Sequence, residues 1–202
     1  MRGKGFDIQK TLQSLYYLQS RCKIADKLSL LKLVFLADRY HIRNYGIPLL
    51  QDNYCAMTLG PVCSKTYDLI KKGLFYDGLT EDAKDFIDEN LFCNKDFVSV
   101  KDTGSDLLSE SDKEALDFSI QNFAKFSPYE LSEITHAYPE WSRYKDLLES
   151  HASASESMDY ADFFSDPEPG NEYINKYLGG KDPFADDQEI LAAMRDEYKS
   201  FA

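Results

Sequence analysis

Apolar side chains recur at helical spacing over the first fifty residues, and the residues that flank them mark where helices begin and end. Residues 8–20 follow Asp7, whose side chain can accept hydrogen bonds from the free backbone amides of a helix start. A longer stripe follows Asp26 and ends at Gly46, a residue suited to the left-handed position after a helix, with Pro48 two residues later. The pattern predicts two amphipathic helices, over residues 8–20 and from Asp26 to Gly46.

The chain between residues 52 and 100 alternates short extended segments with further helices. Residues 52–58 are too short for a helix and precede the Gly60–Pro61 dipeptide, which indicates a strand followed by a turn. Helices are predicted from Ser64 to Gly73 and after Thr80, since serine and threonine favour helix starts. Residues 91–100 surround a polar turn with apolar side chains and predict a small hairpin.

Two capping boxes organise the next part of the chain. Ser111 with Glu114 and Ser127 with Glu130 have the spacing at which a hydroxyl and a carboxylate satisfy the first amides of a helix reciprocally. A third helix is predicted over residues 139–148 because a proline stands at its start. Together, these elements predict a mainly α fold, a compact helical domain with a short β-hairpin or small antiparallel sheet.

The composition changes after residue 150. A stretch of small polar residues follows, which is typical of a linker or a loop. Residues 151–202 carry 12 acidic against 4 basic residues with several aromatic side chains, and a last helix is predicted over 186–195. We expect one domain over residues 1–150 and an acidic, aromatic extension over 151–202. This extension either docks on a basic partner or packs back on the basic front half of its own chain.

The net charge of −12 is distributed unevenly along the 202 residues of the chain. Met1–Phe75 holds 12 Lys or Arg against 5 Asp or Glu, a net of +7, whereas Tyr76–Ala202 holds 11 against 30, a net of −19. The basic residues, Lys32, Arg39 and Arg43 among them, are spread along amphipathic helices and not massed on one recognition helix. Solvated surface or a protein interface is the favoured interpretation, and nucleic-acid binding is not expected.

Neither a membrane segment nor a secretory signal is apparent in the sequence. No apolar run approaches the roughly 20 residues that span a bilayer, and the first residues lack an apolar stretch. We therefore expect a cytoplasmic protein without membrane insertion. Its four cysteines are widely spread, which favours reduced thiols over a metal or redox site; they are Cys22, Cys55, Cys63 and Cys93.

Candidate chemistry is limited to one face of the second helix. Asp38, His41 and Asn44 lie one turn apart and could in principle bind a metal or relay a proton, but helix surface or packing is the favoured interpretation. One histidine and one carboxylate are too few for a metal site. The sequence contains no glycine-rich phosphate loop, no nucleophile elbow and no zinc-protease motif. No cofactor, no metal and no enzymatic activity are expected.

Several ordered blocks of sequence stand out between residues 6 and 150. They are Lys32–His41, Tyr45–Pro48, Asp52–Met57, Gly60–Tyr67, and Leu131–His136 with Trp141 five residues further on. Together these blocks resemble the Panacea domain, a SocA-like antitoxin family that also includes phage-associated and genetic-element proteins. Cys63 stands where the family often has proline, and the extension after residue 150 is less typical of the family.

The resemblance implies a mostly helical bacterial or phage protein that neutralises a toxin by binding it directly, and the toxins beside family members are of many unrelated kinds. One branch of the family instead resembles a proteolytic adaptor that brings its bound toxin to the ClpXP protease, and this role is the alternative. A third hypothesis is a phage or mobile-element interaction protein with another role. Some relatives carry an added DNA-binding segment, which is not expected here because the domain begins near residue 6.

Candidate partner-binding or motif residues come from these blocks and from the acidic extension. They are Asp38, His41, Tyr54, Gly60, Pro61, Val62, Thr135, His136, Trp141, Phe163 and Phe164. Gly60 and Pro61 favour a turn, and Thr135 and His136 stand at a junction between helices. Trp141, at the same junction, is either a core residue or an interface anchor. The expected partner is a cognate protein toxin.

Overall fold

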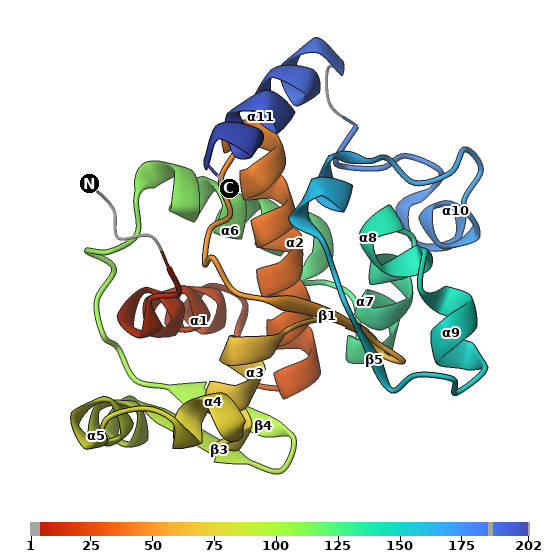
Figure 1. Ribbon diagram of the computed structural model, residues 1–202. Coiled ribbons are helices and arrows are strands. Elements are labelled where there is room, and N and C mark those ends of the chain that lie inside the picture. Colours follow the sequence, from red (N-terminus) through yellow and green to blue (C-terminus); the bar gives the residue numbers. More distant parts are fainter. Residues whose placement is uncertain (1–4, 186–187, 202) are drawn as a thin grey trace.

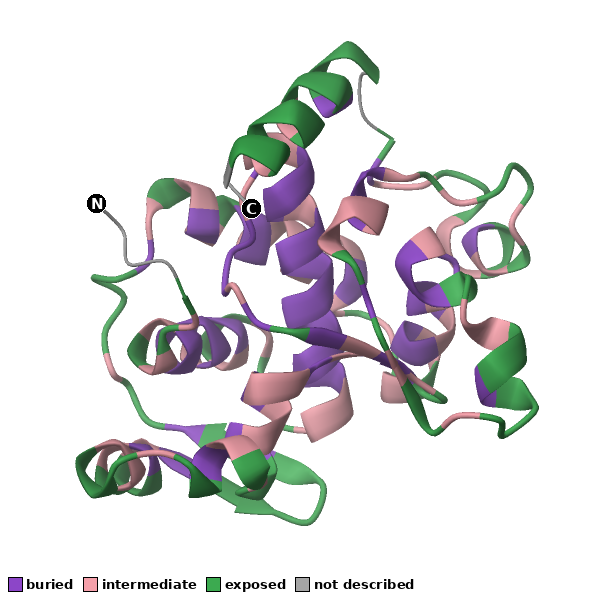
Figure 2. Cartoon of the chain, in the orientation of Figure 1, coloured by how far each residue is buried: buried purple, intermediate pink, exposed green. Residues whose placement is uncertain are grey.

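Helix α2 (Lys27–Tyr45) forms the centre of the molecule in the computed structural model, which describes residues 5–185 and 188–201 (Figure 1). Every residue from Ser29 to Arg39 is buried, and Figure 2 shows the helix as a column of buried residues. A helix that is buried all round is normally apolar on every face. This one also carries charged side chains such as Lys32 and Asp38, which must therefore find partners inside the protein.

The other elements surround α2. Along the chain they are α1 (Ile8–Cys22), β1 (Tyr54–Met57), β2 (Gly60–Cys63), α3 (Ser64–Lys71), α4 (Leu74–Asp77), α5 (Glu81–Asn90), β3 (Leu91–Asn94), β4 (Phe97–Val100), α6 (Glu110–Phe123), α7 (Pro128–Thr135), α8 (Pro139–Ser142), α9 (Lys145–Glu149), β5 (Ser155–Ser157), the 3-10 helix η1 (Tyr160–Phe164), α10 (Glu172–Leu178) and α11 (Gln188–Phe201). Helices α1, α6, α7 and α11, together with η1, pack directly against α2. The predicted mainly α class is confirmed.

Two small antiparallel sheets complete the fold. Strands β3 and β4 form the hairpin predicted over residues 91–100. The other sheet has the order β2-β1-β5, with Tyr54 opposite Cys63 and Cys55 opposite Ser157. The sequence predicted β1 but assigned residues 60–63 to a turn, and β5 was not predicted. A strand of three or four residues has too short a pattern to be recognised alone.

Most of the predicted helix ends are observed. The side chains of Asp7 and Asp26 accept hydrogen bonds from the backbone amides of Lys10 and Ser29, and Gly46 adopts the left-handed conformation after α2. Ser127 and Glu130 form the predicted capping box of α7. These signals are local, because each depends on residues within one turn of the cap.

Two helix predictions are wrong. Helix α6 is capped by Ser109 with Asp112, two residues before the predicted box of Ser111 and Glu114. The predicted helix over residues 139–148 is divided into α8 and α9. A tertiary contact favours the start of α6 at Ser109 over a start at Ser111. Asp112, which belongs to the observed capping box, also forms an ion pair with Lys10 of α1 at 2.8 Å.

The acidic extension packs on the rest of the chain. Strand β5 pairs with β1, and the side chains of Phe163, Phe164 and Phe184 are buried in the common core. Helix α11 begins at Gln188 and lies against α2, while residues 186 and 187 of the predicted last helix lie outside the described residues. The described part of the extension therefore behaves as the self-packing interpretation expects.

No helix within the described residues is long and apolar enough to cross a membrane. The four cysteines are free, with Cys63 buried and Cys93 exposed. Burial raises the pKa of the Cys63 thiol well above its ordinary value, so this side chain remains a neutral thiol in the core.

Candidate functional site

Three of the sequence blocks of the family resemblance, those that contain Lys32, Gly60 and Thr135, meet at the turn between β1 and β2. A Cβ atom on Gly60 would lie 2.7 Å from Oγ1 of Thr135 and 2.8 Å from Nζ of Lys32. Gly60 also has a φ of +96°, a conformation that other residues adopt only with strain. Glycine thus allows α2, β2 and α7 to approach one another at a distance at which any other residue would force Thr135 or Lys32 to move.

Three backbone carbonyls of this hairpin each accept a hydrogen bond from the side chain of a different helix. The donors are Trp141 Nε1 on α8 to Met57 at 2.8 Å, Ser132 Oγ on α7 to Leu59 at 2.7 Å, and Lys32 Nζ on α2 to Pro61 at 2.7 Å. We call Lys32, Ser132 and Trp141 the hairpin cradle. Because the bonds go to alternate carbonyls along the turn, they hold its backbone in one conformation.

Lys32 is an unusual member of the cradle, because its side chain is completely buried. No carboxylate among the described residues forms an ion pair with it. Burial of an unpaired cation is unfavourable, and it lowers the pKa of Lys32 to about 7. A neutral amine can still donate to the Pro61 carbonyl, so the hydrogen bond does not depend on the charge.

Trp141 of the cradle is in direct contact with the imidazole ring of His136. Their rings are stacked with centroids 3.6 Å apart and an angle of 10° between the planes. Burial and the nearby Lys32 lower the pKa of His136 to about 3, so the imidazole is neutral at physiological pH. Trp141 is only 2% exposed, and its Nε1 donates to the Met57 carbonyl. Trp141 is thus a core residue in this structure, and a contact of its ring with a partner stays a prediction.

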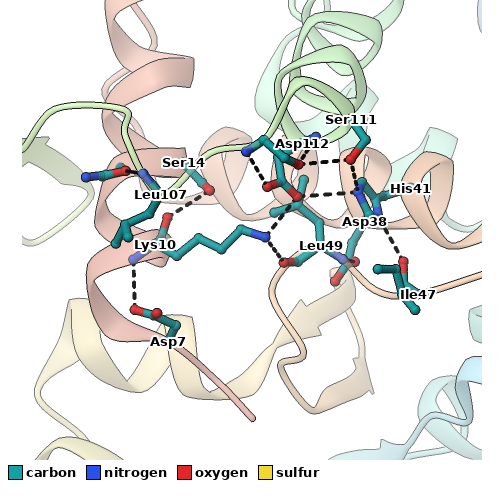
Figure 3. Close-up of polar contacts among 12 residues, drawn as sticks. Asp7, Lys10, Ser14, Asp38, His41, Ile47, Leu49, Leu107, Ser111 and Asp112 are labelled. Carbon is teal, nitrogen blue, oxygen red and sulfur yellow. Dashed lines mark hydrogen bonds and ion pairs between the residues drawn. The ribbon is translucent and has the colours of Figure 1, made fainter. Parts of the chain in front are cut away.

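A second polar cluster fixes the loop that follows α2 (Figure 3). Asp38 accepts a hydrogen bond from the backbone amide of Leu49, and Nδ1 of His41 lies 2.7 Å from the carbonyl oxygen of Ile47. Nδ1 of His41 therefore carries the proton and donates, because a carbonyl oxygen can only accept. Asp38 and His41, which were considered for metal binding or proton transfer, thus form hydrogen bonds that hold the backbone of this loop.

Lys10 and Asp112 close the same cluster from two other helices. Lys10 Nζ donates to the Leu49 carbonyl and to Asp112 Oδ1, both at 2.8 Å, and Asp112 Oδ1 lies 3.3 Å from Nε2 of His41 (Figure 3). The predicted face partner Asn44 points elsewhere, since its amide donates to the Tyr40 carbonyl. Helices α1, α2 and α6 are therefore tied together around one loop.

Asp38 also links the hairpin to the extension. Its second oxygen accepts hydrogen bonds from the hydroxyls of Tyr54 on β1, at 3.0 Å, and Tyr160 on η1, at 3.3 Å. Burial raises the pKa of Asp38 to about 7, and the donors around it oppose that rise. Tyr54 is thus buried beside Asp38, and its predicted contact with a partner stays a prediction.

Two buried arginines of α2 hold the extension. Arg39 forms an ion pair with Glu140 at 2.6 Å, with both side chains fully buried, and donates to the Ser165 carbonyl at 2.8 Å. Arg43 donates to the carbonyl oxygens of Phe163 and Phe184, at 3.0 and 3.2 Å. The assignment of Lys32, Arg39 and Arg43 to a solvated basic surface or a protein interface is wrong, because all three lie in the interior.

The polar residues of the site are arranged for binding and support. Within the described residues, no group of three or more His, Cys, Asp and Glu side chains could hold a metal ion. Three apolar or aromatic side chains on the elements around the cradle are accessible: Leu59 in the turn is 50% exposed, Val62 on β2 is half-buried, and Tyr129, one turn before Ser132 on α7, is 72% exposed. Of the candidate residues, Val62 and His136 are partly accessible, whereas Pro61 and Thr135 are buried.

Sequence reasoning missed the residues that perform most of this support. Lys32, Arg39, Arg43 and Glu140 were not candidate site residues, although each is buried and bonded to a distant segment. A signal was present in α2. Lys32 and Arg39 interrupt a run of apolar residues that covers all faces of the helix, and a charge at such a position is expected to have an internal partner.

The fold and the cradle define a mainly helical domain in which buried polar side chains position a β-hairpin. Comparison with protein families finds a match over residues 30–142 to the family described as antitoxin SocA-like, Panacea domain. The chain belongs to this family, as its ordered blocks suggested. The matched region contains the whole cradle, whereas η1, α10 and α11 lie outside it. Neither the curated proteins nor the solved structures give a match.

Proposed function

We propose that this protein is a cytoplasmic antitoxin that neutralises a cognate protein toxin by direct binding and without catalysis. Family membership supports the antitoxin role, and the turn between β1 and β2 supports the mode of action. Its carbonyls are held by the cradle while the Leu59 side chain remains half exposed. A turn that is already ordered loses little conformational entropy when it binds a partner.

We assign the toxin contact to Leu59 in the turn, Val62 on β2 and Tyr129 on α7, the accessible apolar and aromatic side chains named above. Exposed apolar and aromatic side chains on a rigid support are the usual anchors of protein interfaces. The buried motif residues act indirectly in this proposal. Gly60, Thr135 and Trp141 set the position of the turn, and the residues they position make the contact.

The test is co-expression with the toxin encoded by the neighbouring gene, together with co-elution of the purified proteins. Wild type should restore growth and co-elute, Leu59→Asp should lose both, and Leu107→Asp, at a site 37% exposed, should retain both. Thermal unfolding followed by circular dichroism checks that both variants are folded. A harmless neighbouring gene, or wild-type proteins that elute separately, would reject the antitoxin role. Full activity of Leu59→Asp would reject the hairpin surface.

The role of an adaptor for ClpXP stays a prediction, and no contact of the described residues favours it. It differs from simple masking in one measurable respect. An adaptor requires the half-life of the toxin to fall in the presence of both this protein and the protease, whereas masking leaves an intact toxin in the complex. A mobile-element role of another kind predicts no effect on toxin activity.

A further inference from the structure

A groove of about 580 Å3 lies between the C-terminal end of α3 and strand β3. Four lysines line it, Lys27, Lys71, Lys72 and Lys95, against a single carboxylate, Asp88. The lining residues thus sum to a charge of +3, or +2 when Asp68, which pairs with Lys71 from outside the lining, is included, in a chain whose net charge is −12. Leu69, Ile70 and Leu91 form its buried apolar floor, and Phe92 and Cys93 line its exposed side.

The charges of the groove are accessible to a ligand. Lys72 pairs with Asp88 at 3.0 Å and Lys71 with Asp68 at 3.4 Å, and both lysines are about half exposed. Ion pairs at such exposed positions contribute little to stability, so their lysines can exchange partners at small cost. Lys27 is held differently, since its Nζ donates to the backbone carbonyl of Lys95.

One aromatic residue of the groove, Phe92, shares an exposed face of the β3–β4 hairpin with Phe97. In the β3–β4 register Phe92 faces Ser99 and Phe97 faces Asn94, which places Phe92 and Phe97 diagonally on one face of the hairpin. This is the outer face, because Phe92 is 49% and Phe97 64% exposed, whereas Val98 on the other face is buried. Large apolar side chains exposed side by side are typical of an interaction surface.

We propose that this groove binds an acidic segment of a partner protein, with carboxylates on the lysines and an apolar side chain against Phe92. The inference rests on the proposed function, and it gives the toxin a second contact built from residues other than the cradle. The acidic extension of the chain itself is not the occupant, since its described part is bound to α2 and β1. The total charge of −12 favours a protein segment over a nucleic acid, whose phosphates the rest of the surface repels.

Direct binding is measured by fluorescence anisotropy on the full chain with a labelled twelve-residue peptide of Asp, Glu, Phe and Leu. The double variant Lys71→Glu/Lys72→Glu should bind at least about tenfold more weakly. The matched control Lys125→Glu/Lys181→Glu, with the same change in charge at exposed positions, should remain within about twofold of wild type. Phe92→Ser, which keeps all lysines, should also weaken binding. Equal affinity of wild type and the groove variants, or binding of a DNA duplex in preference to the peptide, would overturn the proposal.

A second arm separates this inference from the proposed function. If wild type neutralises the toxin and Lys71→Glu/Lys72→Glu does so equally well, the groove is not a toxin contact, although the antitoxin role stands. If wild type does not neutralise the toxin, the antitoxin role fails, while the anisotropy measurement still decides whether the groove binds acidic segments. Loss of neutralisation in the groove variant alone supports both.

Discussion

Replacement of Gly60 by alanine is the most direct test of the hairpin cradle. The new methyl group would lie 2.7 Å from Oγ1 of Thr135 and 2.8 Å from Nζ of Lys32, so one of these groups must move. Alanine at a φ of +96° adds backbone strain. We expect Gly60→Ala to fold, but with the Lys32 side chain displaced from the Pro61 carbonyl.

The magnitude follows from two contributions. An alanine at positive φ costs about 1–2 kcal/mol, and loss of a hydrogen bond to a buried charged or polar group costs about 1.5–3 kcal/mol. The free energy of unfolding should thus fall by about 2.5–5 kcal/mol. Gly170→Ala is the matched control, because Gly170 has a φ of +77° and no atom within 4 Å of its Cβ position. It should lose only the backbone contribution.

The assay is urea unfolding followed in parallel by far-UV circular dichroism and by fluorescence. Trp141 is the only tryptophan in the chain and donates to Met57 in the same hairpin, so its emission reports on the cradle. With a typical denaturant dependence of about 2 kcal/mol per molar urea, the midpoints of the two variants should differ by roughly 1 M. Equal midpoints for Gly60→Ala and Gly170→Ala would show that a methyl group at position 60 does not disturb the contacts with Thr135 and Lys32.

Three further predictions concern the buried polar groups. Glu140→Ala leaves Arg39 without its counterion and should reduce the free energy of unfolding by about 3–5 kcal/mol. The double variant Glu140→Leu/Arg39→Met removes both charges and should lose less stability. Urea unfolding of both variants tests this, and an equal or larger loss in the double variant would contradict the prediction. Because the pKa of His136 is about 3 in the folded chain and 6.5 is its ordinary value, only the unfolded state takes up the proton as the pH falls through this range. Wild type should therefore lose stability relative to His136→Phe by about 1 kcal/mol per pH unit between pH 6 and 4, and parallel curves would exclude the assignment. Truncation after Ser150 removes β5 and the Ser165 carbonyl bound by Arg39, so it should abolish cooperative unfolding; a sharp transition in the fragment would show that residues 1–150 fold alone.

The elements that depend on near neighbours could be predicted from the sequence. Helix α2 with its cap at Asp26 and its end at Gly46, the capping box at Ser127, and the β3–β4 hairpin were all expected. In each case the deciding hydrogen bonds join residues a few positions apart. The family resemblance was also visible, because its blocks are contiguous in sequence.

Elements selected by distant contacts could not be predicted. Two overlapping capping boxes, at Ser109 and at Ser111, are equally acceptable locally. Lys10 selects the first by binding Asp112, a residue 102 positions away. The partners of Arg39 could not be identified for the same reason. Its counterion Glu140 and its backbone acceptor at Ser165 come from remote segments, and nothing near α2 in sequence indicates them.

The polar side chains of α2 share one property with a consequence for evolution. They bind main-chain groups of the segments around them: Lys32 to Pro61, Asp38 to Leu49, His41 to Ile47, Arg39 to Ser165, and Arg43 to Phe163 and Phe184. A main-chain group is present whatever the side chain beside it. Surface residues next to these anchors can therefore be exchanged by mutation while the loops keep their shape. In the antitoxin role proposed above, one helix would preserve a scaffold on which a few surface substitutions change the toxin that is bound.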